Sequence, residues 1–242
     1  MIPVDSLLYK IDQKLNKLST NEHQQIQLED KILALNEAQI KLIKQKVDGI
    51  SVMSGGLDAF KKRYEDLQSL IINYNHQPLP LTLKNPEINQ WSASVHDLSP
   101  KYMFYVDSYI LANKGRCKDR KIWINRDLAK HGDLQFILNN EHYKPSFEYQ
   151  ETFNSLSSDE ISVFTDGTFT PSKIYIMYMR YPKYINKEGY IMLDGTPSFN
   201  QDCELEEYLE DELLDLTVQN LAMYTENASA AQSAQFRIQT NE

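Results

Sequence analysis

The chain of 242 residues carries 25 basic and 34 acidic side chains, and its net charge of −9 argues against a surface that grips nucleic acid phosphates throughout. Its two cysteines, Cys117 and Cys203, share no CxxC or CxxH spacing, so we expect no zinc or redox centre. No run approaches the ~20 apolar residues that cross a bilayer, and no basic segment precedes an apolar run at the N-terminus, so we expect a soluble protein made in the cytosol.

Residues 1–80 carry apolar side chains at helical spacing. Asp5 or Ser6 can cap a first helix, and Gly49 is a suitable stop for a second. A third periodic segment ends before Pro78. We therefore expect an N-terminal helical region with helices near residues 7–18, 26–48 and 57–74.

Residues 81–201 are richer in β-branched and aromatic residues, in short runs bounded by turn residues. These runs predict strands near residues 102–106, 121–124, 161–164 and 173–179. Asp166-Gly167 and Asp194-Gly195 predict tight hairpin turns, and we expect residues 190–193 to pair near the strand that contains Tyr175. The region predicts a mainly antiparallel β-sheet or a small sandwich.

Residues 202–226 predict a C-terminal helix whose first half is strongly acidic. A solvated face explains the acids best, while an ion site or a face opposite a basic partner are the alternatives. Residues 227–242 form a polar arm without apolar periodicity, which we expect to be flexible or ordered by a partner. The fold class predicted for the whole chain is α+β.

Motifs for catalysis or cofactor binding are missing from the sequence. The five histidines form no HxH or HExxH unit, and no glycine-rich phosphate loop occurs. Two DGT triplets are similar to the DxDGT loop of haloacid dehalogenase-like phosphatases, but Phe164 and Met192 stand where the nucleophilic carboxylate is needed. We therefore expect no enzyme activity, no catalytic residues, no cofactor and no metal. The aromatic strands lack an accompanying row of Lys or Arg, so core packing is expected for them.

Four stretches in a fixed order carry a family resemblance. They are LNEAQIKL at residues 35–42, YPKYI at 181–185, GYI followed by DGT at 189–196, and DCEL at 202–205. In this order the chain resembles the head-to-tail connector, or neck ring, proteins of crAss-like tailed bacteriophages. The resemblance covers most of the chain, from about residue 5 to about residue 236.

The resemblance implies a structural protein of the virion neck, assembled in the host cytoplasm. Its implied partners are copies of itself in a dodecameric ring, the portal protein, other neck or tail proteins, and DNA that passes transiently through the lumen. A polar arm that orders on a neighbour and helices and loops that point in different directions suit such a ring.

The candidate interface residues lie on two helices. The polar face of the second helix is a candidate contact with a neighbouring subunit or the portal, and the C-terminal helix is a candidate packing element between subunits. The candidate residues are Asn36, Glu37, Gln39, Leu209, Leu213 and Leu216. The alternative for both helices is ordinary packing against the rest of the chain.

The competing function is a β-rich, tail-associated module that binds protein or carbohydrate through Tyr and Trp. Exposed aromatic residues around Trp91, or between Tyr143 and Tyr149, would favour that function. An enzyme ranks third, because no convergent acid and base are found in the sequence.

Overall fold

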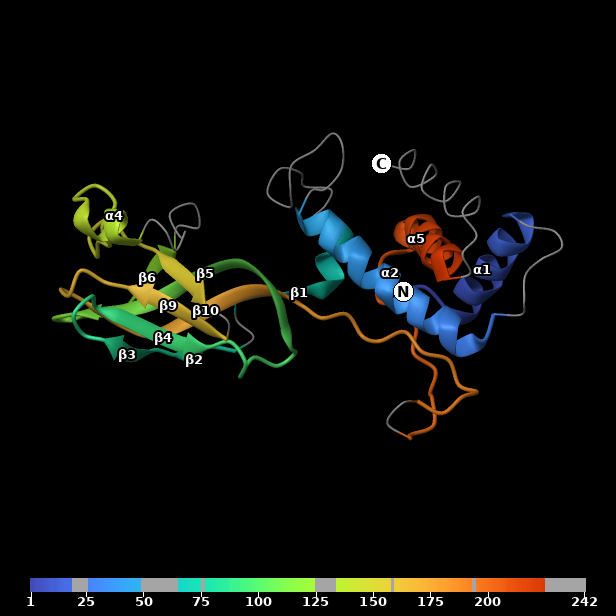
Figure 1. Cartoon of the computed structure of the whole chain (residues 1–242). Helices are drawn as coiled ribbons and strands as arrows, with labels where there is room; N and C mark the ends of the chain where they lie inside the picture. Colours follow the sequence, from blue (N-terminus) through green and yellow to red (C-terminus); the bar gives the residue numbers. More distant parts are fainter. Residues whose placement is uncertain are drawn as a thin grey trace. The chain divides into compact units, whose positions relative to one another are not determined.

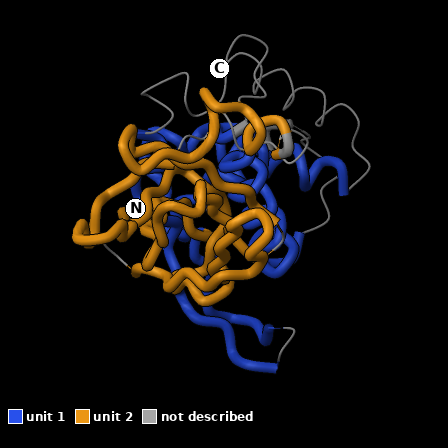
Figure 2. The backbone as a smooth tube through the Cα atoms, turned by 90° about the vertical axis from the view of Figure 1, so that its left-hand side faces the viewer, with its two compact units in different colours: residues 1–70, 182–242 blue, residues 71–181 orange. Residues whose placement is uncertain are grey.

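The chain, seen in a computed structural model, is α+β and consists of two compact units (Figures 1 and 2). Unit 1 contains Met1–Leu70 and Pro182–Glu242, and unit 2 is Ile71–Tyr181. The structure describes residues 1–18, 26–48, 65–74, 77–124, 134–157, 159–192 and 195–224. The unit boundaries differ from the composition boundaries at residues 80 and 201, because the chain after Tyr181 returns to pack with the N-terminal helices.

Three helices with described bounds build the described part of unit 1, and the first two of those predicted are confirmed. They are α1 (Val4–Leu18), α2 (Leu28–Asp48) and α5 (Glu210–Tyr224), with the 3₁₀ turns η2 (Gln68–Leu70) and η5 (Glu207–Leu209). Figure 1 shows α5 between α1 and α2, and it contacts both. The α1 stripe of Leu7, Ile11 and Leu15 is buried, as its four-residue spacing requires.

The first helix, α1, and the C-terminal helix, α5, begin at other residues than the sequence predicted. The first begins at Val4, whose N–H donates to the carboxylate of Asp202 over 3.0 Å, so the cap comes from across the chain. The C-terminal helix begins at Glu210 because Cys203, before it, is extended and forms an antiparallel bridge with Ile2. The polar arm at 227–242 lies outside the described residues.

The third predicted helix is wrong at its C-terminal end, and its first half lies outside the described residues. After the turn η2, Ile71–Ile72 forms strand β1 and pairs with Met179 and Tyr178. Two adjacent β-branched residues thus add to a sheet edge instead of prolonging a helix, because tertiary pairing overrides the helical spacing of this segment.

Unit 2 is a sandwich of two sheets whose described strands are mostly antiparallel, as predicted. The larger sheet has the order β1-β10-β5-β6-β7, with β2 also paired to β10, and the smaller has the order β3-β4-β9-β8. The further strand bounds are β2 (Leu79–Pro80), β3 (Thr82–Asn85), β4 (Gln90–Ser94), β5 (Tyr102–Lys114), β6 (Cys117–Ile124), β7 (Glu151–Thr152), β8 (Asn154–Ser157), β9 (Glu160–Phe164) and β10 (Thr170–Arg180). The short helix α4 (Leu134–Asn139) completes the unit.

The core of unit 2 lies between the two sheets. In the larger sheet, Ile174, Ile110 and Ile122 stand side by side on β10, β5 and β6, and all three are fully buried. Ile161 and Val163 of β9 belong to the same core cluster. Because side chains alternate along a strand, the neighbours of these isoleucines face away from the core.

The two predicted turns are found, but Asp166-Gly167 closes no hairpin, and the pairing predicted between residues 190–193 and the strand of Tyr175 is wrong. At the second turn, the Gly195 N–H donates to the Met192 carbonyl over 2.9 Å. Asp166-Gly167 makes a tight turn, in which Thr168 N–H donates to the Asp166 carboxylate over 2.8 Å, but it connects β9 to β10, which lie in different sheets. Residues 190–192 belong to unit 1 and do not pair with β10, because their partners lie in the segment that follows them, where Ile191 bridges Pro197. Leu193 and Asp194 lie outside the described residues.

Candidate interaction surfaces

Asn36, predicted to face a partner subunit, is instead buried against the returning chain. Its Nδ2 donates to the carbonyls of Ile185 over 2.9 Å and Ile32 over 2.8 Å, and its Oδ1 accepts the Ile185 N–H at 2.8 Å. Its exposed fraction is 7%. The carboxamide therefore satisfies a buried backbone segment of the same chain, and it is not part of an accessible polar face.

Gln39 occupies an equivalent position one helical turn further along α2. It is buried, and its Nε2 donates to the Cys203 thiol over 3.9 Å. Burial raises the pKa of Cys203 to about 11, since the thiolate is poorly solvated there. Cys203 also exchanges two backbone hydrogen bonds of 3.0 Å with Ile2, so the N-terminus is tied to the same place.

Glu37 is the member of the predicted polar face that remains exposed. Its carboxylate accepts a hydrogen bond from the Tyr224 hydroxyl, which raises the pKa of Tyr224 to about 12. The exposed fraction of Tyr224 is 53% and that of the neighbouring Met223 is 54%. Glu37 therefore lies at an accessible end of α5, where the polar and apolar groups needed for a contact occur together.

The three leucines predicted to contact a neighbouring subunit are core residues of unit 1. Leu209, Leu213 and Leu216 are each at most 2% exposed. From residue 213 to 219, every residue of α5 is buried, so this helix is enclosed by its own chain through two turns. An enclosed helix has no open stripe for a second subunit. For these leucines, the structure shows the alternative given above, which is ordinary packing of the helix against the rest of its own chain.

The acidic side chains of α5 pair with lysines of the other two helices. Lys10 contacts Glu210 over 2.5 Å, Lys14 contacts Asp215 over 2.7 Å, and Lys46 contacts Glu212 over 2.7 Å; these lysines lie on α1, α1 and α2. The basic partner considered for this helix is thus in the same chain. Lys10 and Lys14 are four residues apart, so they share one face of α1, and this spacing was a signal that the sequence contained.

An extended hairpin at residues 186–201 leaves unit 1 between Ile185, which is buried, and Asp202, which is exposed. Asn186 and Gln201 exchange two backbone hydrogen bonds of 3.0 and 2.9 Å at its base. Ile191, toward its tip, is 71% exposed, and Phe199, closer to its base, is 56% exposed. Figure 1 shows this segment, in orange, extending away from the helices of unit 1. Large apolar side chains at such exposure on a backbone fixed at its base favour a contact with another molecule.

The outer face of the larger sheet carries two adjacent rows of side chains across β10, β5 and β6. One row is Tyr175, Tyr109 and Trp123, and the next is Lys173, Leu111 and Lys121. Trp123 is 46% exposed, and both lysines are exposed. The expected core packing is therefore confirmed for Tyr109, which is buried, and wrong for Trp123, and the expected lack of basic neighbours is wrong at this face. The cause lies in strand pairing, which places Tyr109 between Trp123, 14 positions later in the sequence, and Tyr175, 66 positions later.

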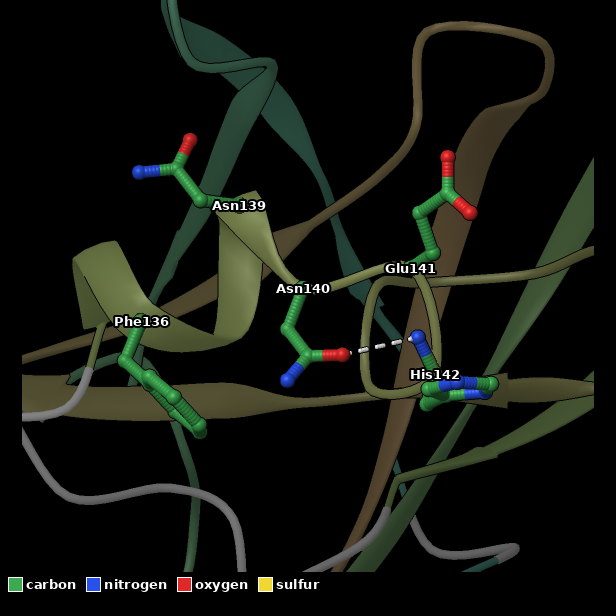
Figure 3. A pocket seen from close by; sticks show the side chains of 5 residues that line it. All are labelled: Phe136, Asn139, Asn140, Glu141 and His142. Carbon is green, nitrogen blue, oxygen red and sulfur yellow. Dashed lines mark hydrogen bonds between the residues drawn. The ribbon is translucent and has the colours of Figure 1, made fainter.

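A shallow depression beside α4 is a further candidate surface (Figure 3). Its volume is about 480 Å³, and its lining residues are Phe136, Asn139, Asn140, Glu141 and His142. The Asn140 side chain accepts the backbone N–H of His142 over 3.0 Å, which fixes the turn after the helix. The Tyr143 ring lies 6.2 Å from that of Phe136, and Tyr143 is 47% exposed. Tyr149 is 82% exposed. Trp91, in contrast, is partly buried and packs against the core of unit 2.

Within the described ranges no group of three or more His, Cys, Asp or Glu side chains could hold a metal ion. None of the described helices is both long and apolar enough to cross a membrane. Comparisons with protein-family models and with curated protein sequences give no match for this chain. Its relationship to neck proteins therefore rests on the four sequence stretches and stays a prediction.

Proposed function

We propose that this chain is a structural virion protein that forms a ring in the neck of a tailed bacteriophage, connects portal to tail and surrounds the passage of DNA. The observation that supports the proposal is that three of the four stretches that resemble neck proteins contact one another in unit 1. Asn36 of the first stretch binds Ile185 of the second, and Gln39 of the first binds Cys203 of the fourth. Between these two anchors lies the 186–201 hairpin, which contains the third stretch.

This arrangement suits a scaffold that presents one contact element. The buried amide contacts fix both ends of the hairpin, so little conformational freedom is lost at its base when it binds. Exposed Ile191 and Phe199 supply apolar area for a neighbouring subunit or the portal. Glu37, beside Tyr224, supports a second and different contact surface, as a head-to-tail ring requires. The proposal includes no catalytic residue and no cofactor.

Cryo-electron microscopy of the particle that contains this chain tests the proposal. We expect a closed ring of copies on the portal axis, with the 186–201 hairpin in contact with another chain. A peripheral or solitary position of the chain would overturn the proposal.

A variant test isolates the hairpin. Ile191→Asp combined with Phe199→Asp should prevent incorporation of the chain into the neck, because two charges replace apolar contact area. The matched control is Leu83→Asp on β3, where a side chain of 48% exposure lies outside the hairpin. Equal incorporation of both variants would exclude the hairpin as the contact.

The alternative function is a tail-associated module that binds protein or carbohydrate. The exposed Tyr143, whose ring lies beside that of Phe136 in the depression of Figure 3, favours it, because aromatic rings beside amide and carboxylate groups suit sugar recognition. Tyr149 is a further exposed aromatic residue in the predicted range. Titration with host surface glycans tests it. Binding that is lost in Phe136→Ala, together with a peripheral position in the particle, would replace the ring proposal by this one.

A further inference from the structure

The net charge of the chain is divided unequally between its two units. Unit 2 contains 12 basic and 12 acidic residues, whereas unit 1 contains 13 basic and 22 acidic residues, so unit 1 carries the whole net charge of −9. A cationic surface on unit 2 would therefore be attracted to unit 1 of another copy.

The outer face of β10, β5 and β6 carries two exposed lysines, at the end of the face away from Asp107, whose carboxylate accepts the Tyr74 hydroxyl over 2.5 Å. Lys173 and Lys121 flank Leu111 in one cross-strand row, directly beside the row of Tyr175, Tyr109 and Trp123. Proteins use this combination of Trp, Tyr and flanking charge at interface centres, where the aromatic rings supply apolar area and the charges select the partner.

The packing of the rings argues for a protein partner over stacked bases or sugars. The Tyr109 and Tyr175 rings are parallel with centroids 4.9 Å apart, and Trp123 meets Tyr109 edge-on at 5.5 Å. The Lys121 ammonium lies 3.8 Å from the centroid of the Trp123 ring and 3.9 Å from that of Tyr109. Ring faces covered by one another and by a cation are not open platforms for successive bases.

We propose that this face of unit 2 binds the acidic unit 1 of a second copy of the chain. The contact joins two different surfaces, so it is head-to-tail, and such contacts close into rings when the rotation between copies allows it. This inference rests on the proposed ring function and names one of its interfaces. On unit 1 the exposed carboxylates of Glu207, in the turn η5, and Asp211, in the first turn of α5, are suitable partners for the two lysines.

Zero-length carbodiimide cross-linking of the full chain tests the contact. Isotopically light and heavy copies are mixed, cross-linked and digested, so that peptides of mixed isotope content report only contacts between copies. We expect mixed products that join Lys121 or Lys173 to carboxylates of unit 1. In parallel, Lys121→Glu with Lys173→Glu should weaken self-association by about tenfold or more in dissociation constant. The control Lys84→Glu with Lys144→Glu makes the same charge change at exposed lysines elsewhere on unit 2.

The outcomes separate this inference from the ring itself. Mixed products that arise only from other lysines, in a chain that still forms rings, would overturn the assignment of this face and leave the ring proposal standing. Absence of any mixed product would also overturn the inference, and the position of the chain in the particle would then decide the ring separately. Binding of a labelled single-stranded oligonucleotide that is lost in Lys121→Glu with Lys173→Glu would overturn it by assigning the face to nucleic acid.

Discussion

The carboxamide of Asn36 and the backbone of Ile185 form a reciprocal pair of hydrogen bonds, 2.9 and 2.8 Å long, between residues 149 positions apart in the chain. Ile185 is fully buried, and Asn36 is nearly so. The Asn36 carboxamide thus supplies the donor and the acceptor that the backbone of a neighbouring strand would otherwise supply to Ile185. The contact fixes the point at which the chain returns to the helices of unit 1.

Asn36→Ala should lower the free energy of unfolding of unit 1 by about 2–4 kcal/mol, because the N–H and C=O of Ile185 lose a partner in a buried place. Urea unfolding followed by far-UV circular dichroism measures the change, since α1, α2 and α5 all lie in unit 1. Lys44→Ala, an exposed position on the same helix, is the control and should stay within about 0.5 kcal/mol of the original protein. An equal loss in both variants would show that the pair does not stabilise the unit.

Local patterns predicted the elements better than the contacts between them. The spacing of Leu7, Ile11 and Leu15 fixes α1 through its own periodicity, and alternating β-branched residues do the same for β10. Asn36 and Gln39 were read as surface because polar residues on an amphipathic helix usually face water. Their buried partners, Ile185 and Cys203, are about 150 residues or more away in the sequence. A local sequence pattern does not predict contacts at such a separation.

The candidate surfaces depended on the same kind of information. Tyr109, Trp123 and Tyr175 form one row only through the register of three strands, and the sequence alone does not fix a register. The lysines that pair with the acidic residues of α5 lie on α1 and α2. The sequence shows these charged residues, but it does not show which of them form pairs. The sequence did indicate that residues 181–205 are important, although it did not indicate that they pack on α2.

Lys14→Met should destabilise unit 1 more than Lys31→Met. Lys14 contacts Asp215, whose side chain is 4% exposed, whereas Lys31 contacts Asp12, whose side chain is 47% exposed. Removing a cation from a buried carboxylate costs several kcal/mol when nothing replaces it, but Asp215 makes a further interaction, so we expect about 1–3 kcal/mol. The exposed pair should contribute at most about 1 kcal/mol. Urea unfolding at low and high salt measures both; a larger effect for Lys31→Met would contradict the assignment of the buried pair.

The two thiols should react at very different rates with a thiol reagent. Cys117 is exposed at the first position of β6, whereas Cys203 is fully buried beside Gln39. We expect Cys117 to react at least about a hundredfold faster in the native protein, because Cys203 becomes accessible only when unit 1 opens. Cys117→Ser should leave a single slow thiol and Cys203→Ser a single fast one. Two thiols of equal rate would place Cys203 at the surface.

Cys203 also predicts a dependence of stability on pH. The ordinary pKa of a cysteine thiol, 9.0, applies when the chain is unfolded and the thiol is solvated, and burial raises the pKa of Cys203 to about 11 in the folded protein. As the pH rises from 9.0 toward 11, the unfolded chain loses its proton first, so the stability of unit 1 should fall across this window and be unaffected by this group below it. Cys203→Ala should flatten that part of the profile. An unchanged alkaline slope in this variant would assign the loss to other groups.

Gly167→Ala should destabilise unit 2 more than Gly115→Ala. Gly167 has φ = +80°, beyond the usual left-handed region, and an added Cβ would lie 3.1 Å from the Asn89 side chain. Gly115 has φ = +55°, inside that region, and an added Cβ would meet no atom within 4 Å. We expect a loss of about 2 kcal/mol at Gly167 and about 1 kcal/mol at Gly115. Tryptophan fluorescence during urea unfolding is the measurement, because both tryptophans, Trp91 and Trp123, belong to unit 2. Equal losses would mean that the turn between β9 and β10 relaxes to accept a side chain, and the connection between the two sheets would then be less constrained than its hydrogen bonds indicate.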